Sequence, residues 1–393
     1  MDRDELGTLL TPEGLRLLDE VGPIEESADV VRLVSRLRAA GHSPELVAAV
    51  LTQARLRARA RAKFGDFAAR MLFTRDGLEQ ATRLRVAATH AGRFPAAGID
   101  VVADLGCGIG GDAIALAALD LGVIAVDRDE VTAAIASYNL APFPDARVEC
   151  AAAEEVDLAG IGGVWLDPAR RGSGRRLDDP ADWSPSLEWA FELARGVPTG
   201  IKLAPGMDRA LIPPEFEAQW VSVERETVEL VLWSGALARD GVRRAALVLG
   251  SAGEAPAELA AAEDAPDAPA GELGRYLVEP AGAVIRARLI GDLARRLEGR
   301  MLDPEIAWIT TDDAPVTPFG AGFRVLERLP LDERVLRRAL TDRGVGIVEI
   351  KTRGVDVDPA ALRRRLKPEG KGSATLVLTR IAGERTAILA ERL

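Results

Sequence analysis

A run of glycines between carboxylates is the part of the sequence whose spacing most clearly indicates chemistry. Residues 101–112 read VVADLGCGIGGD, so a short apolar stretch leads into glycines and then into a predicted helix. Glycines at such a junction let backbone N–H groups approach a ligand closely. Gly106, Gly108 and Gly111 also match the G-x-G-x-x-G spacing of dinucleotide-binding loops, and Asp127 ends the next apolar stretch. The pattern predicts a site for a nucleotide-like cofactor.

Two acidic residues distinguish between the candidate cofactors. Asp104 precedes the first glycine and Asp112 begins the following helix, and both would repel a pyrophosphate in a partly desolvated loop. S-adenosylmethionine carries an ammonium and a sulfonium group and no phosphate, so Asp104 can accept from its amino-acid end while Asp127 binds the ribose hydroxyls. We therefore expect S-adenosylmethionine as the cofactor, and a nicotinamide-dependent oxidoreductase is the disfavoured alternative.

A second motif follows the fourth predicted strand, at 163–166. The run Leu166-Asp167-Pro168-Ala169-Arg170-Arg171 resembles the [Asp/Asn/Ser]-Pro-Pro-[aromatic] motif of amine methyltransferases. In that motif the acidic or amide side chain and a backbone carbonyl accept hydrogen bonds from the target amine. The resemblance makes Asp167, Pro168 and Arg170 the catalytic candidates, with Ala169 and Arg170 departing from the pattern. Because this loop contains no cysteine, nitrogen or oxygen is the expected acceptor rather than carbon.

The glycine loop resembles the first motif of the class I S-adenosylmethionine-dependent methyltransferases. This resemblance implies a Rossmann-like, mostly parallel sheet that ends in an antiparallel hairpin, for which Glu229–Trp233 and Arg244–Leu249 are the predicted strands. It also implies that Glu154, or its neighbour Glu155, reaches the adenine amino group, and that Cys107 contributes its backbone N–H. The implied cofactor contacts are Asp104, Gly106, Cys107, Gly108, Gly110, Asp127, Arg128 and Glu154.

Longer resemblances connect the chain with RNA enzymes. Residues 101–168 are most similar to the trimethylguanosine synthase type of RNA methyltransferase. The runs LFTRDGLEQAT at 72–82 and IKLAPG at 201–206, with VEIKTRGVD at 348–356 and LRRRLK at 362–367, together resemble a bacterial methyltransferase family with a carboxyl-terminal THUMP-like domain. THUMP domains are associated with the delivery of structured RNA to attached enzymes, so the resemblance implies an RNA substrate.

The elements that would position these motifs follow from the apolar periodicity. Residues 1–95 have helical spacing, notably at 28–40 and 44–62, and are expected to form a helical domain. Residues 96–250 alternate β-rich and Ala-rich stretches, typical of an α/β methyltransferase domain. An Ala-, Pro- and acid-rich segment at 251–274 is expected to be a solvated linker. A connecting region at 275–319 then precedes a small α/β module at 320–393, with the predicted order strand, helix, strand, helix, strand, strand.

Charge is unevenly distributed along the chain. The net charge is −11, yet residues 320–393 hold 16 Lys and Arg against 10 Asp and Glu, which leaves −17 for the rest. Such a basic module can follow a phosphate backbone. The RNA-binding candidates are Lys351, Arg353, Arg363, Arg364, Arg365 and Lys367. A second candidate is an RNA-facing ridge of Arg55, Arg57, Arg59, Arg61 and Lys63, although a spacing of two scatters residues around a helix.

Composition excludes several other classes of protein. Two cysteines and two histidines make a disulfide framework or a zinc site unsupported, so no metal is expected. The apolar runs fall short of the roughly 20 residues that span a bilayer, and the amino terminus MDRDELG lacks the pattern of an export signal. We therefore expect a cytoplasmic methyltransferase that modifies RNA at a nitrogen. The alternatives are a methyltransferase of a small molecule or protein, and a non-catalytic RNA-binding protein with a methyltransferase-like scaffold.

Overall fold

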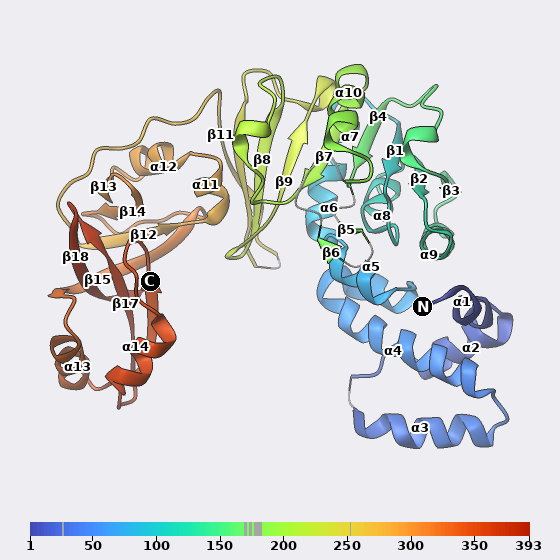
Figure 1. Cartoon of the computed structure of the whole chain (residues 1–393), viewed down its shortest axis with the longest axis horizontal. Coiled ribbons are helices and arrows are strands. Elements are labelled where there is room, and N and C mark those ends of the chain that lie inside the picture. The colour runs from blue at the N-terminus through green and yellow to red at the C-terminus, as the bar shows by residue number, and fades with distance from the viewer. Residues whose placement is uncertain (26, 169–170, 173–174, 177–182, 252) are drawn as a thin grey trace. The chain divides into compact units, whose positions relative to one another are not determined.

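The computed structural model describes residues 1–393 except 26, 169–170, 173–174, 177–182 and 252 (Figure 1). The described chain divides into two compact units. The first comprises residues 1–203 with 232–238, and the second comprises 204–231 with 239–393. Arg170, one of the catalytic candidates, lies outside the described residues.

The first 96 residues are helical, as the periodicity predicts. They form α1 (Arg3–Leu9), α2 (Pro12–Val21), α3 (Ser27–Ala39), α4 (Pro44–Phe64), η1 (Gly65–Arg70), α5 (Arg75–Gln80), α6 (Leu84–Ala91) and α7 (Arg93–Ala96). Helix α4 begins where Ser43 accepts a hydrogen bond from the Leu46 N–H. The predicted basic ridge on α4 is wrong at two of its five residues: Arg57 is buried and donates to the Met71 carbonyl, and the Lys63 ammonium donates to the Leu78 carbonyl. Arg55, Arg59 and Arg61 are exposed.

A mixed sheet follows, in the strand order β11-β10-β8-β9-β7-β4-β1-β2-β3. Its strands are β1 (Val101–Leu105), β2 (Gly122–Asp127), β3 (Ala146–Cys150), β4 (Gly163–Leu166), β7 (Thr199–Leu203), β8 (Glu217–Val223), β9 (Glu226–Trp233), β10 (Arg244–Leu249) and β11 (Ala257–Ala261). Strand β1 pairs in parallel with β2 and with β4, and β4 in parallel with β7. The carboxyl ends of these strands therefore share one edge, as the α/β prediction requires.

Helices and short segments connect these strands. They are α8 (Gly111–Ala117), α9 (Glu130–Leu140), η2 (Ala153–Glu155), α10 (Leu187–Gly196), η4 (Arg209–Leu211) and η5 (Gly235–Leu237), with a short ribbon of β5 (Arg171–Gly172) and β6 (Arg175–Arg176). Helix α8 starts directly after the glycine loop, so the loop joins the end of β1 to a helix N-terminus. This is the strand-to-helix junction that the glycine spacing predicts.

The antiparallel hairpin of the sheet contains only one of the two predicted strands, and β10 and β11 lie beyond it. Residues 229–233 and 244–249 are strands, but their predicted pairing is wrong: β10 pairs in parallel with β8. The hairpin instead joins β8 to β9 through Glu224 and Arg225, which is too short a connection for parallel strands. Glu224 has a φ of +54°, and because the turn contains no glycine it lacks the ordinary signal of a hairpin turn.

The predicted solvated linker at 251–274 is wrong in its middle. Residues 257–261 form β11, which pairs antiparallel with β10 and buries Leu259 completely. Ala265 and Ala268 are buried as well. Alanine adds little hydrophobic signal to a sequence, but its small side chain packs readily against a neighbouring strand, so composition alone misjudged this segment.

The second sheet has the order β13-β14-β12-β15-β18-β17-β16. The region expected to be a connection supplies β12 (Tyr276–Pro280), α11 (Gly282–Arg286), α12 (Ile290–Arg296), β13 (Arg300–Asp303) and β14 (Ile306–Thr311). The carboxyl-terminal module supplies β15 (Gly320–Pro330), α13 (Glu333–Asp342), β16 (Val345–Thr352), α14 (Pro359–Leu366), β17 (Gly372–Ile381) and β18 (Glu384–Arg392). The module has the predicted element order, and antiparallel pairing of β15 with β12 joins it to the preceding region.

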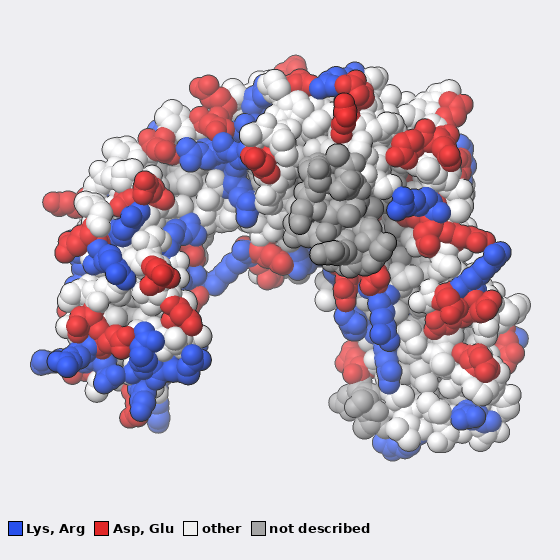
Figure 2. Space-filling model, in the orientation of Figure 1, with Lys and Arg blue, Asp and Glu red and all other residues white. Residues whose placement is uncertain are grey.

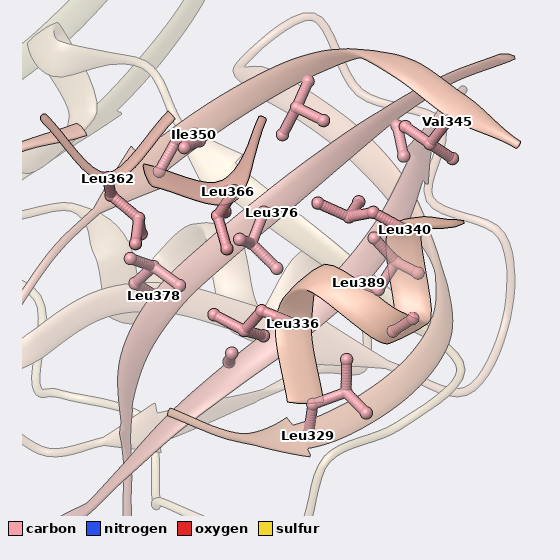
Figure 3. Close-up of a cluster of buried hydrophobic side chains, with 14 residues drawn as sticks. Leu329, Leu336, Leu340, Val345, Ile350, Leu362, Leu366, Leu376, Leu378 and Leu389 are labelled. Atoms are coloured by element: carbon pink, nitrogen blue, oxygen red, sulfur yellow. The ribbon is translucent and has the colours of Figure 1, made fainter. Parts of the chain in front are cut away.

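One apolar cluster holds the two helices of the module against its strands (Figure 3). Helix α13 contributes Leu336 and Leu340, and helix α14 contributes Leu362 and Leu366. Residues four apart lie on the same helical face, and the arginines between these leucines are exposed. The arginines of both helices are therefore presented to solvent.

Candidate cofactor and acceptor site

The glycine loop adopts a backbone that favours glycine at three positions. Gly106, Gly108 and Gly110 have φ values of +86°, +56° and +84°, in the left-handed region. A Cβ atom at Gly106 would lie only 2.8 Å from the backbone oxygen of Asp167, whereas one at Gly108 would meet nothing within 4 Å. The loop is therefore packed directly against the start of the Asp-Pro-Ala-Arg motif on one side and is open at Gly108.

Asp127 holds the loop through its side chain. Its carboxylate, at the end of β2, accepts hydrogen bonds from the N–H groups of Gly108 at 3.0 Å and Asp129 at 2.9 Å. Burial raises the pKa of Asp127 in spite of these two hydrogen bonds, which favour the ionised form. A carboxylate with this position can bind hydroxyl groups of a ligand that lies on the loop.

Asp104 is a buried carboxylate with an oxygen that lacks a partner. Its exposed fraction is 1%, and Oδ2 has no hydrogen-bond partner among the described residues. Burial raises the pKa of Asp104 well above its usual value, and the charge of Asp112 raises it further. Such a group is costly unless a cation or donor completes it. The ammonium group of S-adenosylmethionine has the charge and the donors that this oxygen requires, so the residues fit that cofactor.

Three other predicted cofactor residues differ in their surroundings. The Cys107 N–H donates to the Val126 carbonyl at 2.9 Å, so the expectation that this N–H faces the ligand is wrong. Arg128 is exposed, and its guanidinium donates to the Ser184 hydroxyl at 2.9 Å. Glu154 is exposed on η2, beyond the carboxyl end of β3. Because β3 is parallel to β2, that end lies at the same sheet edge as the loop.

Asp167 follows β4, next to the end of β1 that carries the loop. Its N–H donates to the Leu105 carbonyl at 3.2 Å, and its side chain is 36% exposed. Pro168 is buried. The Asp167 carboxylate lies 2.6 Å from the ammonium nitrogen of Lys202, a residue that the sequence analysis did not assign to the site.

Lys202 could have been found from strand pairing. In the parallel pair β4 and β7, Leu166 lies opposite Ile201, so the next residues, Asp167 just after β4 and Lys202 within β7, lie side by side. The Lys202 ammonium also donates to the Thr82 hydroxyl at 2.8 Å and lies 3.4 Å from Asp112. The signal was present in the IKLAPG run, but its use required the strand register.

The basic residues of the module separate into two groups. Lys351 lies 2.7 Å from Glu279 and is 15% exposed, and Arg353 donates to the Ala307 carbonyl at 3.2 Å. Burial lowers the pKa of Arg353. These two predicted RNA-binding residues already have partners within the protein, and their limited exposure leaves little of either side chain for a phosphate.

The second group lies on helices α13 and α14 and the turns after them. Exposed basic residues there are Arg334, Arg337, Arg338, Arg343, Arg363, Arg364, Arg365, Lys367 and Lys371, which we name the helical basic face. Figure 2 shows blue side chains gathered over this part of the module. Arg365 pairs with Glu333 at 2.8 Å, but Arg363, Arg364 and Lys367 form no ion pair with a described carboxylate. The sequence prediction omitted the α13 arginines because they are spread among apolar residues and form no run like RRR.

Two kinds of feature are absent from the part of the chain that the structure describes. Its histidines, cysteines and acidic residues form no group of three or more able to hold a metal ion. None of its helices combines the length and apolar character needed to cross a membrane.

Comparisons with known proteins found similarities for the carboxyl-terminal module and for most of the chain. Residues 320–392 match the family described as THUMP domain-like, and residues 2–60 match a domain of unknown function, DUF8688. S-adenosylmethionine-dependent methyltransferases from two strains of Mycobacterium tuberculosis are each 36% identical over 354 residues, covering 88% of this chain and 95% of the relative. A solved structure from Porphyromonas gingivalis W83, described as a methyltransferase, has a TM-score of 0.74 at 22% identity, covering 100% and 98% of the two chains.

Proposed function

We propose that this chain, which belongs to the family of S-adenosylmethionine-dependent methyltransferases represented by its Mycobacterium tuberculosis relatives, methylates RNA at a nitrogen atom. The observation that carries the proposal is the close approach of the Gly106 loop to Asp167. It brings the cofactor loop and the residue that would orient the substrate amine to one edge of the sheet. The RNA part rests on the THUMP-like match and on the helical basic face.

The cofactor would be held by the loop and its carboxylates. In this proposal Asp104 accepts from the cofactor ammonium, Asp127 accepts from the ribose hydroxyls, and Glu154 binds the adenine amino group. When bound, S-adenosylmethionine supplies an electrophilic methyl group on a cationic sulfur. The partnerless oxygen of Asp104 supports the first of these roles, since a buried carboxylate gains most from a cationic ligand.

Asp167 would orient the acceptor. Its carboxylate accepts a hydrogen bond from the acceptor N–H, which directs the nitrogen lone pair toward the methyl carbon. A nitrogen–carbon bond forms as the carbon–sulfur bond breaks, and that bonding pair goes to sulfur. The carboxylate also offsets the positive charge that develops on nitrogen, whose proton then passes to solvent. The backbone carbonyl of buried Pro168 is the second acceptor in the resembling motif, and Arg170 would contact the base or its phosphate.

The helical basic face would bind the RNA backbone. Its side chains offer charge without aromatic residues, a combination suited to phosphates of a helical stem rather than to stacked bases. Arg363, Arg364, Arg365 and Lys367 of the predicted set belong to this face. Lys351 and Arg353 stay weaker candidates because protein groups already bind them.

A methyltransferase of a small molecule or protein is the second candidate. The net charge of −17 outside the module favours it, since a negative surface repels RNA. A non-catalytic RNA-binding role is the third candidate, supported by the departure of the motif at Ala169 and Arg170 from the amine-methyltransferase pattern.

Transfer of labelled methyl groups from S-adenosylmethionine into bacterial RNA, protein and small-molecule fractions tests the proposal. We expect label in RNA with the wild type and none with Asp167→Ala, while binding of S-adenosylhomocysteine is retained. Label confined to protein or small molecules would instead support the second candidate. Absence of label in every fraction, with cofactor binding intact, would support the third.

Charge reversal at Arg363 and Arg364 tests the RNA-binding part. The matched control is Arg385→Glu, which changes an exposed arginine of the same module near the start of β18. Deletion of residues 320–393 would be a poor test, because β15 pairs with β12 and its loss would expose that strand. We expect the double reversal to weaken RNA binding and the control to leave it unchanged. Equal effects of both variants would contradict a specific role for the helical basic face.

A further inference from the structure

Lys202 connects Asp167, the residue proposed to orient the substrate amine, with Asp112 in the first turn of the helix after the glycine loop. Its ammonium nitrogen lies 2.6 Å from Asp167 Oδ2 and 3.4 Å from Asp112 Oδ2, and it donates to Thr82 Oγ1 at 2.8 Å. The Thr82 hydroxyl in turn donates to Asp112 Oδ2 at 3.0 Å. Lys202 and Asp112 are only 12% and 14% exposed, so their pairing is shielded from water.

The surroundings make this ammonium important to the charge of the site. Asp104 and Asp112 each have a buried oxygen without a hydrogen-bond partner among the described residues. Asp112, Asp127 and Asp167 all disfavour ionisation of Asp104, and Lys202 favours it. In a shielded cluster of carboxylates, a neighbouring cation decides how many of them stay ionised.

We propose that Lys202 is a positioning residue that holds Asp167 ionised and oriented toward the acceptor amine. The inference rests on the proposed role of Asp167. An ionised carboxylate can only accept hydrogen bonds, whereas a protonated one can also donate to the nitrogen lone pair that must attack the methyl group. Lys202 therefore protects the reactive lone pair by keeping the proton away from Asp167. Thr82 and Asp112 bind the same ammonium, so the lysine is held between Asp167 and the first turn of α8.

The groups that face Asp167 and Lys202 come from several elements. Asp104 belongs to β1, Asp112 to α8, Asp127 to β2, and Thr82 to the segment after α5. Since the four carboxylates share this region with the Lys202 ammonium, removal of that ammonium takes away the cation 2.6 Å from Asp167 and leaves the like charges of the other carboxylates in place. The rate of methyl transfer should then depend on pH in a way that a structural lysine would not affect.

The test compares K202M, K202R, D167N and the double variant D167N/K202M of the full chain in the RNA methylation assay. We expect K202M to slow transfer about tenfold or more near neutral pH, with S-adenosylhomocysteine affinity within about threefold of the wild type. The acidic limb of its rate profile should move to higher pH. K202R should recover part of the rate, since the guanidinium retains the charge. In the D167N background, K202M should change the rate less than about twofold.

The control is R147M, which removes an exposed cation of β3 that pairs only at the surface with Glu149. It should match the wild type in rate and pH profile. A wild-type rate in K202M, equal slowing of transfer by K202M with and without Asp167, or a proportional loss of cofactor affinity would each overturn the proposal. Wild-type transfer by Asp167→Ala, which removes the hydrogen-bond acceptor that asparagine would retain, would contradict the proposed function itself, and that is a separate outcome.

Thr82→Val provides a second route if K202M does not fold. The variant removes one acceptor of the lysine and the hydroxyl that donates to Asp112, while a methyl group replaces the hydroxyl. We expect a smaller loss of rate with the same direction of pH shift. An unchanged rate and pH profile in Thr82→Val would count against the network.

Discussion

Replacement of Asp104 by asparagine should make the free protein more stable and the cofactor complex weaker. Asp104 is 1% exposed, and burial raises its pKa well above the usual value. The folded state therefore holds this proton to higher pH than the unfolded state, where an aspartate titrates near about 4. The free energy of unfolding of the wild type must then fall as pH rises through this window. The asparagine variant carries no titrating proton at this position and should lose this dependence.

The magnitudes follow from the charge alone. A buried group without its partner costs about 1–3 kcal/mol, so Asp104→Asn should stabilise the free protein by about 1–2 kcal/mol at neutral pH and by less near pH 4. A hydrogen bond between charged groups contributes about 1.5–3 kcal/mol, so affinity for S-adenosylhomocysteine should fall roughly 10- to 100-fold.

Urea unfolding at several pH values measures the first effect, and calorimetric titration with S-adenosylhomocysteine measures the second. The ligand should therefore raise the stability of the wild type more than that of the variant, since stabilisation by a ligand depends on its affinity. A variant that is less stable at every pH, or that binds the ligand as tightly as the wild type, would refute the role of Asp104 as a carboxylate held ready for a cation.

Three further predictions concern the loop and the basic face. Gly106→Ala should abolish most activity because its Cβ would lie 2.8 Å from a backbone oxygen, whereas Gly108→Ala, with open space around it, should cost only about 1–2 kcal/mol of backbone strain; unfolding and activity assays distinguish them. Asp127→Ala should weaken S-adenosylhomocysteine binding about tenfold or more while circular dichroism stays unchanged, and unaltered affinity would remove it from the site. Reversal of Arg363 and Arg364 should weaken RNA binding and reduce the salt dependence of log K by about one per lost phosphate contact; an unchanged slope would mean that neither touches a phosphate.

Local sequence patterns predicted the parts of the fold that depend on neighbouring residues. The G-x-G-x-x-G spacing of Gly106, Gly108 and Gly111 identified the loop, and Gly106, Gly108 and Gly110 adopt the left-handed backbone that favours glycine. The alternation of Leu336 and Leu340 with arginines likewise identified α13. Such features depend on contacts within a few residues, and the sequence contains all the information they require.

Features that depend on strand order were harder to predict. The partner of β10 is β8 rather than β9. The sequences of β9 and β10 do not show that another strand lies between them, so this order could not be predicted. The pairing of Asp167 with Lys202 depends on the register of β4 and β7. Arg57 was likewise predicted to face RNA, but it is buried and donates to the Met71 carbonyl, a partner that the sequence of its own helix does not reveal.

The distribution of charge connects the two proposed binding functions. In the proposed site, the carboxylates of Asp104, Asp112, Asp127 and Asp167 would attract a cationic cofactor and would repel a phosphate backbone. An RNA substrate must therefore obtain its binding free energy from another part of the protein. The helical basic face offers such a source: Arg338, Arg343 and Arg365 pair with carboxylates of the module, but Arg363, Arg364 and Lys367 are exposed and form no ion pair with a described carboxylate. This division would let the acidic site select a base for its N–H donor, while affinity for the RNA is set elsewhere in the chain.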